Sequence, residues 1–182
     1  LLEVTPGAGG ASGDWELLID SEWTVKAGDE TYLCVVAKVP EQMYVQAFRP
    51  IAPLGTHHTV LTRAPNQSEG VFPCNAGTNG QYMIYGSGVG TQQLELPDGV
   101  AVKLEAGESL LLNLHLFNTA SSPLTGISGV EVKRIAAKDV KHEAQIVLAG
   151  PTTLNIPPQS KKTEKGSCTV PADVTLWAVG PH

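Results

Sequence analysis

The amino-acid sequence predicts an all-β protein, an antiparallel jelly-roll sandwich, and three observations favour this fold. At least seven segments show the strand pattern, in which apolar and polar residues alternate. No segment shows a convincing helical periodicity. Glycine and proline are frequent, with 19 and 13 residues among 182, and many of them lie between the strand segments, where they favour turns.

The first four strands are predicted before the first long loop. Residues 1–11 end in a glycine-rich run and predict a loose arm. Residues 15–25 alternate as a strand with one buried face does, and residues 31–39 are rich in β-branched and aromatic residues. Residues 43–48 alternate again until prolines end the run, and residues 56–62 form the next candidate strand.

Weaker signals occupy the middle of the chain. Residues 64–80 contain two prolines and three glycines, which predict a long surface loop with Cys74 as its tether. Residues 81–85 predict a short strand, the GSGVG run at 86–90 a flexible turn, and residues 93–96 the start of another strand.

The strand signals are strongest in the third quarter of the chain. Residues 100–104, 109–118 and 127–135 alternate clearly. One face of the 109–118 strand consists of four leucines, and its other face presents Leu111, Asn113, His115 and Phe117. We therefore expect His115 to project between the sheets or into a cleft.

The strand pattern is interrupted once before it resumes near the C-terminus. Residues 136–142 are polar and predict a linker. Residues 144–148 and 170–179 predict strands again, separated by a lysine-containing loop.

Length and charge restrict the functions that the chain can have. A chain of 182 residues with 42% hydrophobic residues can build a core. Its 12 basic against 18 acidic residues argue against a nucleic-acid partner, which requires a basic face. No apolar run approaches the roughly 18 to 20 residues that span a bilayer, and no signal-peptide pattern is present, so we expect a soluble, mature protein.

Three cysteines, Cys34, Cys74 and Cys168, are widely spaced in the sequence. None forms a CxxC pair, which argues against zinc-finger and thioredoxin-like sites. One disulfide with one remaining cysteine, or three buried free thiols, are both compatible with this pattern.

The histidines carry the strongest chemical signal. His57 and His58 are adjacent, and together with His115 they could bind a copper or zinc ion. Neighbouring residues of a regular strand point to opposite faces, so a shared metal requires a bulge or strand end near residues 53–55. Asn113 could support an imidazole from behind. The alternative is two partly exposed histidines and one hydrogen-bonded core histidine.

Other catalytic motifs are missing from the sequence. No GxSxG elbow, phosphate-binding glycine loop or HExxH helix occurs. Several carboxylates lie near strand edges and turns, but nothing selects two of them as a glycosidase pair. They are Asp14, Glu16, Asp20, Glu22, Asp29 and Glu30.

An ordered series of short motifs runs through most of the chain. It comprises Tyr32-Leu33-Cys34 with Pro40, Phe48-Arg49-Pro50, Thr56-His57-His58-Thr59-Val60-Leu61, Leu112-Asn113-Leu114-His115, Gly126-Ile127-Ser128-Gly129-Val130, Ile156-Pro157-Pro158 and Cys168-Thr169-Val170-Pro171. In order and spacing the series resembles the copper type II, ascorbate-dependent monooxygenases, the family of peptidylglycine α-hydroxylating monooxygenase and dopamine β-hydroxylase.

The resemblance implies two jelly-roll domains with one copper each, separated by an open cleft. His57, His58 and His115 correspond to the ligands of the first-domain copper, which receives and stores an electron. The second-domain copper binds oxygen and hydroxylates the substrate carbon through an HxH motif and a methionine, with ascorbate as reductant.

The same resemblance implies that the chain contains one whole domain and part of a second, and the chain departs from the family pattern at several residues. It implies a copper-binding jelly-roll domain at 1–137 and the initial strands of a second, truncated jelly roll at 138–182. His182 falls where the HxH motif would begin, as a remnant of the second site, and no methionine is in the family position. The region where the family has a partner for Cys34 contains no cysteine, and Cys168 would pair beyond the end of this chain. Cys34 and Cys74 are the candidates for a disulfide.

We therefore expect the electron-transfer copper domain of an ascorbate-dependent monooxygenase, with one copper per chain and no hydroxylation by itself. Its expected partners are the missing second copper domain, a small-molecule or peptide substrate of the intact enzyme, and another copy through exposed C-terminal strands. The family implies a secreted, periplasmic or other oxidising compartment. The alternatives are a non-catalytic secreted copper-binding or interaction module with the same sandwich, and a carbohydrate-binding sandwich without metal.

Overall fold

A computed structural model describes residues 14–77, 82–150, 154–167, 169–170 and 172–179. The chain divides into two compact units, Leu1–Ile146 and Val147–His182. The predicted arm at 1–11, Cys168 and His182 lie outside the described residues.

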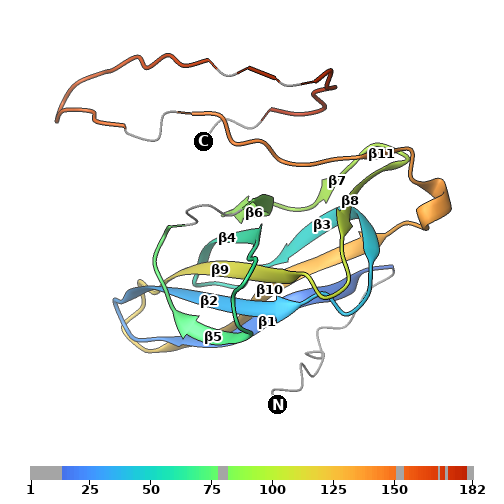
Figure 1. The fold of residues 1–182 in the computed structure, drawn as a ribbon. Helices are drawn as coiled ribbons and strands as arrows, with labels where there is room; N and C mark the ends of the chain where they lie inside the picture. The colour runs from blue at the N-terminus through green and yellow to red at the C-terminus, as the bar shows by residue number, and fades with distance from the viewer. Residues whose placement is uncertain (1–13, 78–81, 151–153, 168, 171, 180–182) are drawn as a thin grey trace. The chain divides into compact units, whose positions relative to one another are not determined.

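The first unit is a sandwich of two β-sheets (Figure 1). One sheet has the strand order β1-β10-β3-β8-β11, with β7 paired to β3, and the other has the order β5-β2-β9-β4-β6. The strands are β1 (Glu16–Val25), β2 (Glu30–Lys38), β3 (Met43–Ile51), β4 (Thr56–Arg63), β5 (Gly70–Pro73), β6 (Met83–Gly88), β7 (Leu94–Glu95), β8 (Val100–Leu104), β9 (Ser109–Phe117), β10 (Leu124–Arg134) and β11 (His142–Glu143).

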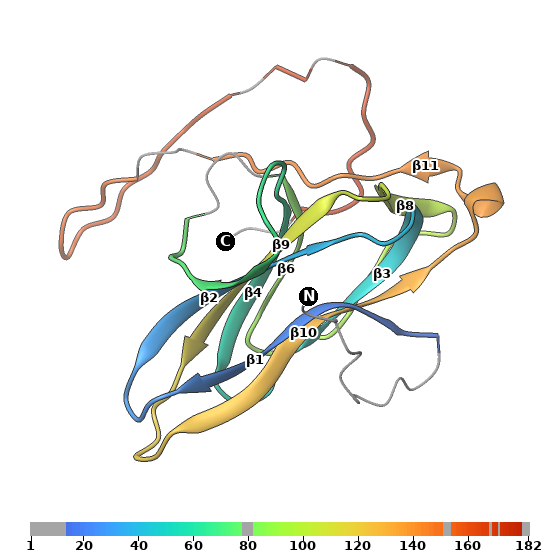
Figure 2. The same cartoon turned by 60° about the horizontal axis from the view of Figure 1, so that its bottom comes forward.

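The connectivity explains how a single chain builds both layers. The first four strands alternate between the sheets, and β10 returns to lie between β1 and β3, as Figure 2 also shows. All strand pairs are antiparallel except β11 with β8. This winding is that of a jelly roll, and the prediction of an all-β sandwich is confirmed.

Strand β9 lies at the centre of its sheet and divides the core from the outer surface. Its four leucines face inward and belong to the main core cluster, as the alternation predicted. They are Leu110, Leu112, Leu114 and Leu116, each at most 2% exposed. Leu111, on the opposite face, packs in a small separate cluster with Cys34, Val36 and Ala64. The outer face of β9 is thus free to carry polar side chains.

Two segments differ from the sequence prediction because strand partners extend them. The predicted loop at 64–80 contains β5, which pairs with β2. The predicted turn at 86–90 is strand up to Gly88, because residues 86–88 of β6 pair with residues 58–60 of β4. A Cβ at Gly86 would lie 2.3 Å from Cε of Met83, so the absent side chain makes room for that methionine.

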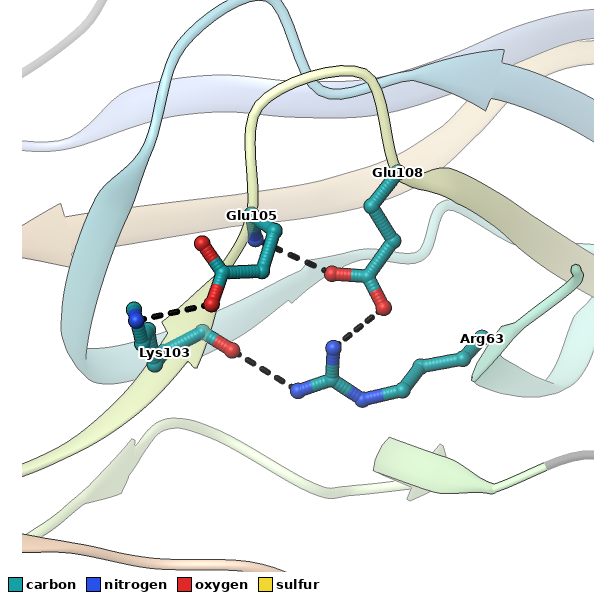
Figure 3. A network of polar contacts seen from close by, with 4 residues as sticks. All are labelled: Arg63, Lys103, Glu105 and Glu108. Atoms are coloured by element: carbon teal, nitrogen blue, oxygen red, sulfur yellow. Dashed lines mark hydrogen bonds and ion pairs between the residues drawn. The ribbon is translucent and has the colours of Figure 1, made fainter.

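An ion-pair network holds the far end of β4 to the turn between β8 and β9 (Figure 3). Arg63 pairs with Glu108 and donates a second hydrogen bond, of 2.7 Å, to the Lys103 carbonyl. Glu108 also accepts the backbone N–H of Glu105 at 3.0 Å, and the Glu105 side chain pairs with Lys103. The network fixes β4 at the end opposite to its histidines.

The connection after β10 contains a short 3₁₀ helix, η1 (Ala137–Asp139), within the predicted linker. Strand β11 then pairs with β8, and the N–H of Ala144 donates to the carbonyl of Ala101 at 2.9 Å. The first unit therefore extends beyond residue 137.

The second unit has no strand among its described residues, and the strand predictions over 144–148 and 170–179 are not met in the part that the structure describes. Alternation favours a strand only where a neighbour pairs its backbone groups, and among these described residues no strand pairing continues beyond the hydrogen bond of Ala144 to Ala101. The unit leaves a series of apolar side chains exposed: Val147, Leu148, Leu154, Ile156, Val170, Val174, Leu176, Trp177 and Val179. Within the described part of the chain, no helix has the length and apolarity needed to cross a membrane.

Candidate metal centre

A β-bulge brings the adjacent histidines to the same face of the sheet. In the β4–β9 ladder Thr56 pairs with Leu116 and His58 with His115, so His57 is an extra residue with no partner in the register. Such a bulge places two successive residues opposite one and re-aims their side chains. The geometric requirement that the sequence imposed is therefore met, at His57 itself.

The three imidazole rings converge on the outer face of the sheet. Nδ1 of His58 lies 3.2 Å from Nδ1 of His57 and 3.2 Å from Nδ1 of His115. One nitrogen from each ring falls within 4.8 Å of the other two. His57 is exposed, His58 is intermediate and His115 is buried, so the cluster is open to solvent on one side.

The spacing of these nitrogens fits a single metal ion. Imidazole nitrogens bind Zn²⁺ at about 2.0–2.1 Å, so two of them on one ion lie about 3–4 Å apart. The same 3.2 Å separations also suit an N–H···N hydrogen bond, which describes the rings in the absence of an ion. Three imidazoles suit copper, zinc, iron or nickel, so the donor set alone leaves the metal open.

The loop before the histidine pair is seated on a buried tryptophan. Gly55 has φ +101°, and a Cβ there would lie 2.7 Å from Leu124 Cδ2 and 2.8 Å from Trp23 Cη2. Trp23 Nε1–H donates to Ser128 Oγ at 2.7 Å, and Ser128 Oγ lies 2.6 Å from Thr56 Oγ1. These contacts join the two sheets directly beneath the start of β4, and they hold the bulge in place.

Two residues that the sequence did not assign to the site contact His115 from β2. Oε1 of Glu30 lies 2.5 Å from Nε2 of His115, the ring nitrogen that faces away from the cluster. Tyr32 stacks on the same imidazole, with ring centroids 4.4 Å apart and planes 5° apart. Tyr32 pairs with His115 in the β2–β9 ladder, so the strand register produces this contact. Alternation shows which residues share a face, but the register between distant strands was needed to find these two.

The hydrogen bonds of Asn113 lead to the loop after β5, whereas the sequence predicted that it would support an imidazole. Side chains two positions apart on a strand are separated by about 6.5 Å along it, and Asn113 lies opposite Cys34. Its Nδ2 donates to the carbonyl of Asn75 at 2.8 Å and approaches Cys74 Sγ at 3.7 Å. Asn113 therefore holds the loop after β5 against the sheet.

Cys34 and Cys74 form a disulfide, which decides between the two cysteine patterns that the sequence allowed. Their Cα atoms are 5.8 Å apart, and the bond ties the loop after β5 to β2. A disulfide is consistent with an oxidising compartment. The disulfide lies on the same face of the sheet as His115. Cys34 and Tyr32 are two positions apart on β2 and share its outer face, and Tyr32 pairs with His115.

An open hollow of about 600 Å³ borders the exposed side of the cluster. His57 and His58 form part of its wall, with the apolar side chains of Leu54, Val89 and Phe117. None of the described residues that line it carries a formal charge with histidine neutral. The hollow gives small molecules access to the rings.

The remaining sequence candidates lie elsewhere. His142 is exposed on β11 and is not part of the histidine cluster. Among the carboxylates, Glu16 pairs with Arg134, and burial together with Glu22 raises the pKa of Asp20.

The site combines three convergent nitrogens, one carboxylate behind His115 and an open approach. It can hold a metal ion without disturbing the core, because all three rings lie on the outer face. Comparison with models of known protein families and with curated proteins found no match.

Proposed function

We propose that this chain binds one copper ion through His57, His58 and His115 and is the electron-transfer domain of an ascorbate-dependent copper monooxygenase. The observation that supports this most directly is the convergence of the three Nδ1 atoms, two pairs of which are 3.2 Å apart. The motif series that resembles this family contains the same three histidines, at positions that the fold brings together.

Copper is favoured over the other metals by its redox chemistry and by the resemblance. A bound copper ion would supply one-electron exchange between its +1 and +2 states, and three nitrogen ligands suit the reduced ion. The side chains of this chain would hold the ligand set in place: Tyr32 covers one face of His115, and the sheet fixes the backbone of all three histidines. The open hollow would admit ascorbate to the exposed rings.

The remaining chemistry is assigned to partners. A second copper domain would activate oxygen and hydroxylate a C–H bond of a small-molecule or peptide substrate, and the described chain would only store and pass an electron. The Cys34–Cys74 disulfide supports a secreted or periplasmic setting. Exposed apolar side chains after residue 146 would contact the second domain or another copy.

Cu(I) affinity tests this proposal better than Cu(II) affinity, because Cu(II) binds most nitrogen sites tightly. The chain should compete with a chromophoric Cu(I) chelator at one ion per chain. Substitution of His115 by alanine should weaken binding by at least about 10-fold, and His57→Ala and His58→Ala should have similar effects. His142→Ala is the matched control, since this exposed histidine lies outside the cluster, and it should bind as the wild type does. Absence of Cu(I) binding, or equal loss in the control, would refute the site.

A non-catalytic secreted copper-binding module is the second candidate. Within the described residues one group of three potential ligands is present, and the two methionines of the chain are used for packing in the sandwich. Ascorbate distinguishes the two functions. An electron-transfer domain should lose its Cu(II) EPR signal with ascorbate and regain it with a one-electron oxidant over repeated cycles. A copper-holding module would resist reduction or release its ion on the first cycle.

A further inference from the structure

The carboxylate of Glu30 occupies a position that decides how His115 faces the cluster. Oε1 lies 2.5 Å from Nε2 of His115, while Nδ1 of the same ring lies 3.2 Å from Nδ1 of His58. The two nitrogens of an imidazole point in diverging directions, so the carboxylate does not compete for the space between the three rings.

The chemistry of the pair fixes the proton on one ring nitrogen. An ionised carboxylate only accepts hydrogen bonds, so Nε2 of His115 must carry the hydrogen. In a neutral imidazole the other nitrogen then keeps its lone pair. That nitrogen is Nδ1, which faces His58 and is therefore available to a metal.

Stacking by Tyr32 alone would not determine which nitrogen of His115 faces the other two histidines. Parallel rings with centroids 4.4 Å apart restrict the plane of the His115 ring. A half-turn of the ring about Cβ–Cγ keeps that plane but exchanges Nδ1 for a carbon atom. The hydrogen bond to Glu30 distinguishes the two orientations, because only one places Nε2 at the carboxylate.

The backbone of Glu30 is itself held before any ligand arrives. Glu30 begins β2 and pairs with Phe117 in the ladder. The preceding turn is closed by a 3.2 Å hydrogen bond from the N–H of Asp29 to the carbonyl of Lys26, and the backbone N–H of Asn118 donates to the carbonyl of Asp29 at 2.9 Å. The carboxylate is thus presented from a fixed position, although its side chain is about half exposed.

We propose that Glu30 is a positioning residue that keeps His115 as the Nε2–H tautomer and so presents its Nδ1 to the metal. This inference rests on the proposed copper site for its purpose, but the tautomer is a property of the metal-free chain. Partners of this kind behind a metal ligand change metal affinity by about 10- to 100-fold.

The ¹⁵N chemical shifts of the His115 ring in the metal-free chain, at mildly alkaline pH, test the tautomer directly. The wild type and Glu30→Gln, whose amide oxygen still accepts a hydrogen bond, should show the Nε2–H tautomer. Glu30→Ala should show a mixture of tautomers. An Nδ1–H tautomer in the wild type, or no change in Glu30→Ala, overturns the proposal whether or not copper binds.

Cu(I) affinity of the same variants supplies the second measurement. Glu30→Ala should bind about 10- to 100-fold more weakly than the wild type, and Glu30→Gln should recover most of that loss. Glu22→Ala removes an exposed glutamate from the other sheet and should bind normally. Wild-type affinity in Glu30→Ala with lost affinity in His115→Ala overturns the role of Glu30 and leaves the copper site intact. A tautomer that depends on Glu30 in a chain that binds no copper refutes the proposed function alone.

Discussion

Replacing Gly55 by alanine should destabilise the sandwich at the point where it supports the histidines. The new Cβ would lie 2.7 Å from Leu124 Cδ2 and 2.8 Å from Trp23 Cη2. The leucine methyl can rotate away, but the indole is buried and hydrogen-bonded to Ser128, so the loop must move instead. Overpacking of this kind costs about 1–3 kcal/mol, and the positive φ adds about 1–2 kcal/mol.

Gly28→Ala is the matched control for the backbone part of this cost. Gly28 has φ +75°, and a Cβ there would meet no atom within 4 Å. Both variants change the entropy of the unfolded chain equally and place an alanine at a positive φ, so the difference between them reports mainly the packing term.

Urea unfolding, followed by tryptophan fluorescence, should give a free energy of unfolding about 1–3 kcal/mol lower for Gly55→Ala than for Gly28→Ala. The Gly55 variant should also bind Cu(I) more weakly, since the displaced loop leads directly into His57. Equal stability of the two variants would show that the loop does not rest on Trp23 as described.

Two further perturbations test the supports of the fold. Removing the disulfide, which spans 40 residues, with paired Cys34→Ser and Cys74→Ser substitutions should lower the free energy of unfolding by about 4 kcal/mol on the chain-entropy estimate. The thermal midpoint of that variant should no longer respond to a reducing agent, and a midpoint equal to that of the oxidised wild type contradicts the estimate. Burial raises the pKa of Tyr85 from 10.0 to about 12, with a smaller opposing effect from the nearby Ser87 hydroxyl. Between these values the unfolded chain loses the phenol proton while the folded chain keeps it, so stability should fall by about 1.4 kcal/mol per pH unit. Tyr85→Phe should lack this part of the decline in urea titrations at about pH 9 and about pH 11, and a slope identical to that of the wild type would exclude the residue.

The sequence could predict those features that a single strand encodes. The leucine face of β9 and the place of His115 on the opposite face follow from alternation within ten residues, and both are observed. The expectation that His115 projects between the sheets is wrong, because the leucines occupy that side and leave His115 on the outer face. The requirement for a bulge near the adjacent histidines also follows from local geometry, because a regular strand would separate them.

Contacts that depend on the register between distant strands could not be predicted from the alternation within one strand. Glu30 and Tyr32 reach His115 because β2 pairs with β9, and nothing in their own segment indicates that partner. The hydrogen bonds of Asn113 to the loop after β5 depend on register in the same way, since the ladder places this residue opposite Cys34. The segments predicted as strands after residue 143 show the opposite case. Their residues alternate as a strand requires, but among the described residues no strand pairs with them.

The two faces of β9 have separate roles, and this separation affects how the metal site can change. Its leucines build the interior, and its other face carries the histidine, so ligand substitutions leave the packing that folds the chain untouched. Small zinc domains differ, because their folding free energy comes from the metal. The sheet is therefore a scaffold whose outer surface can accept substitutions. Different sets of metal ligands, or none, can occupy this surface while the fold is retained.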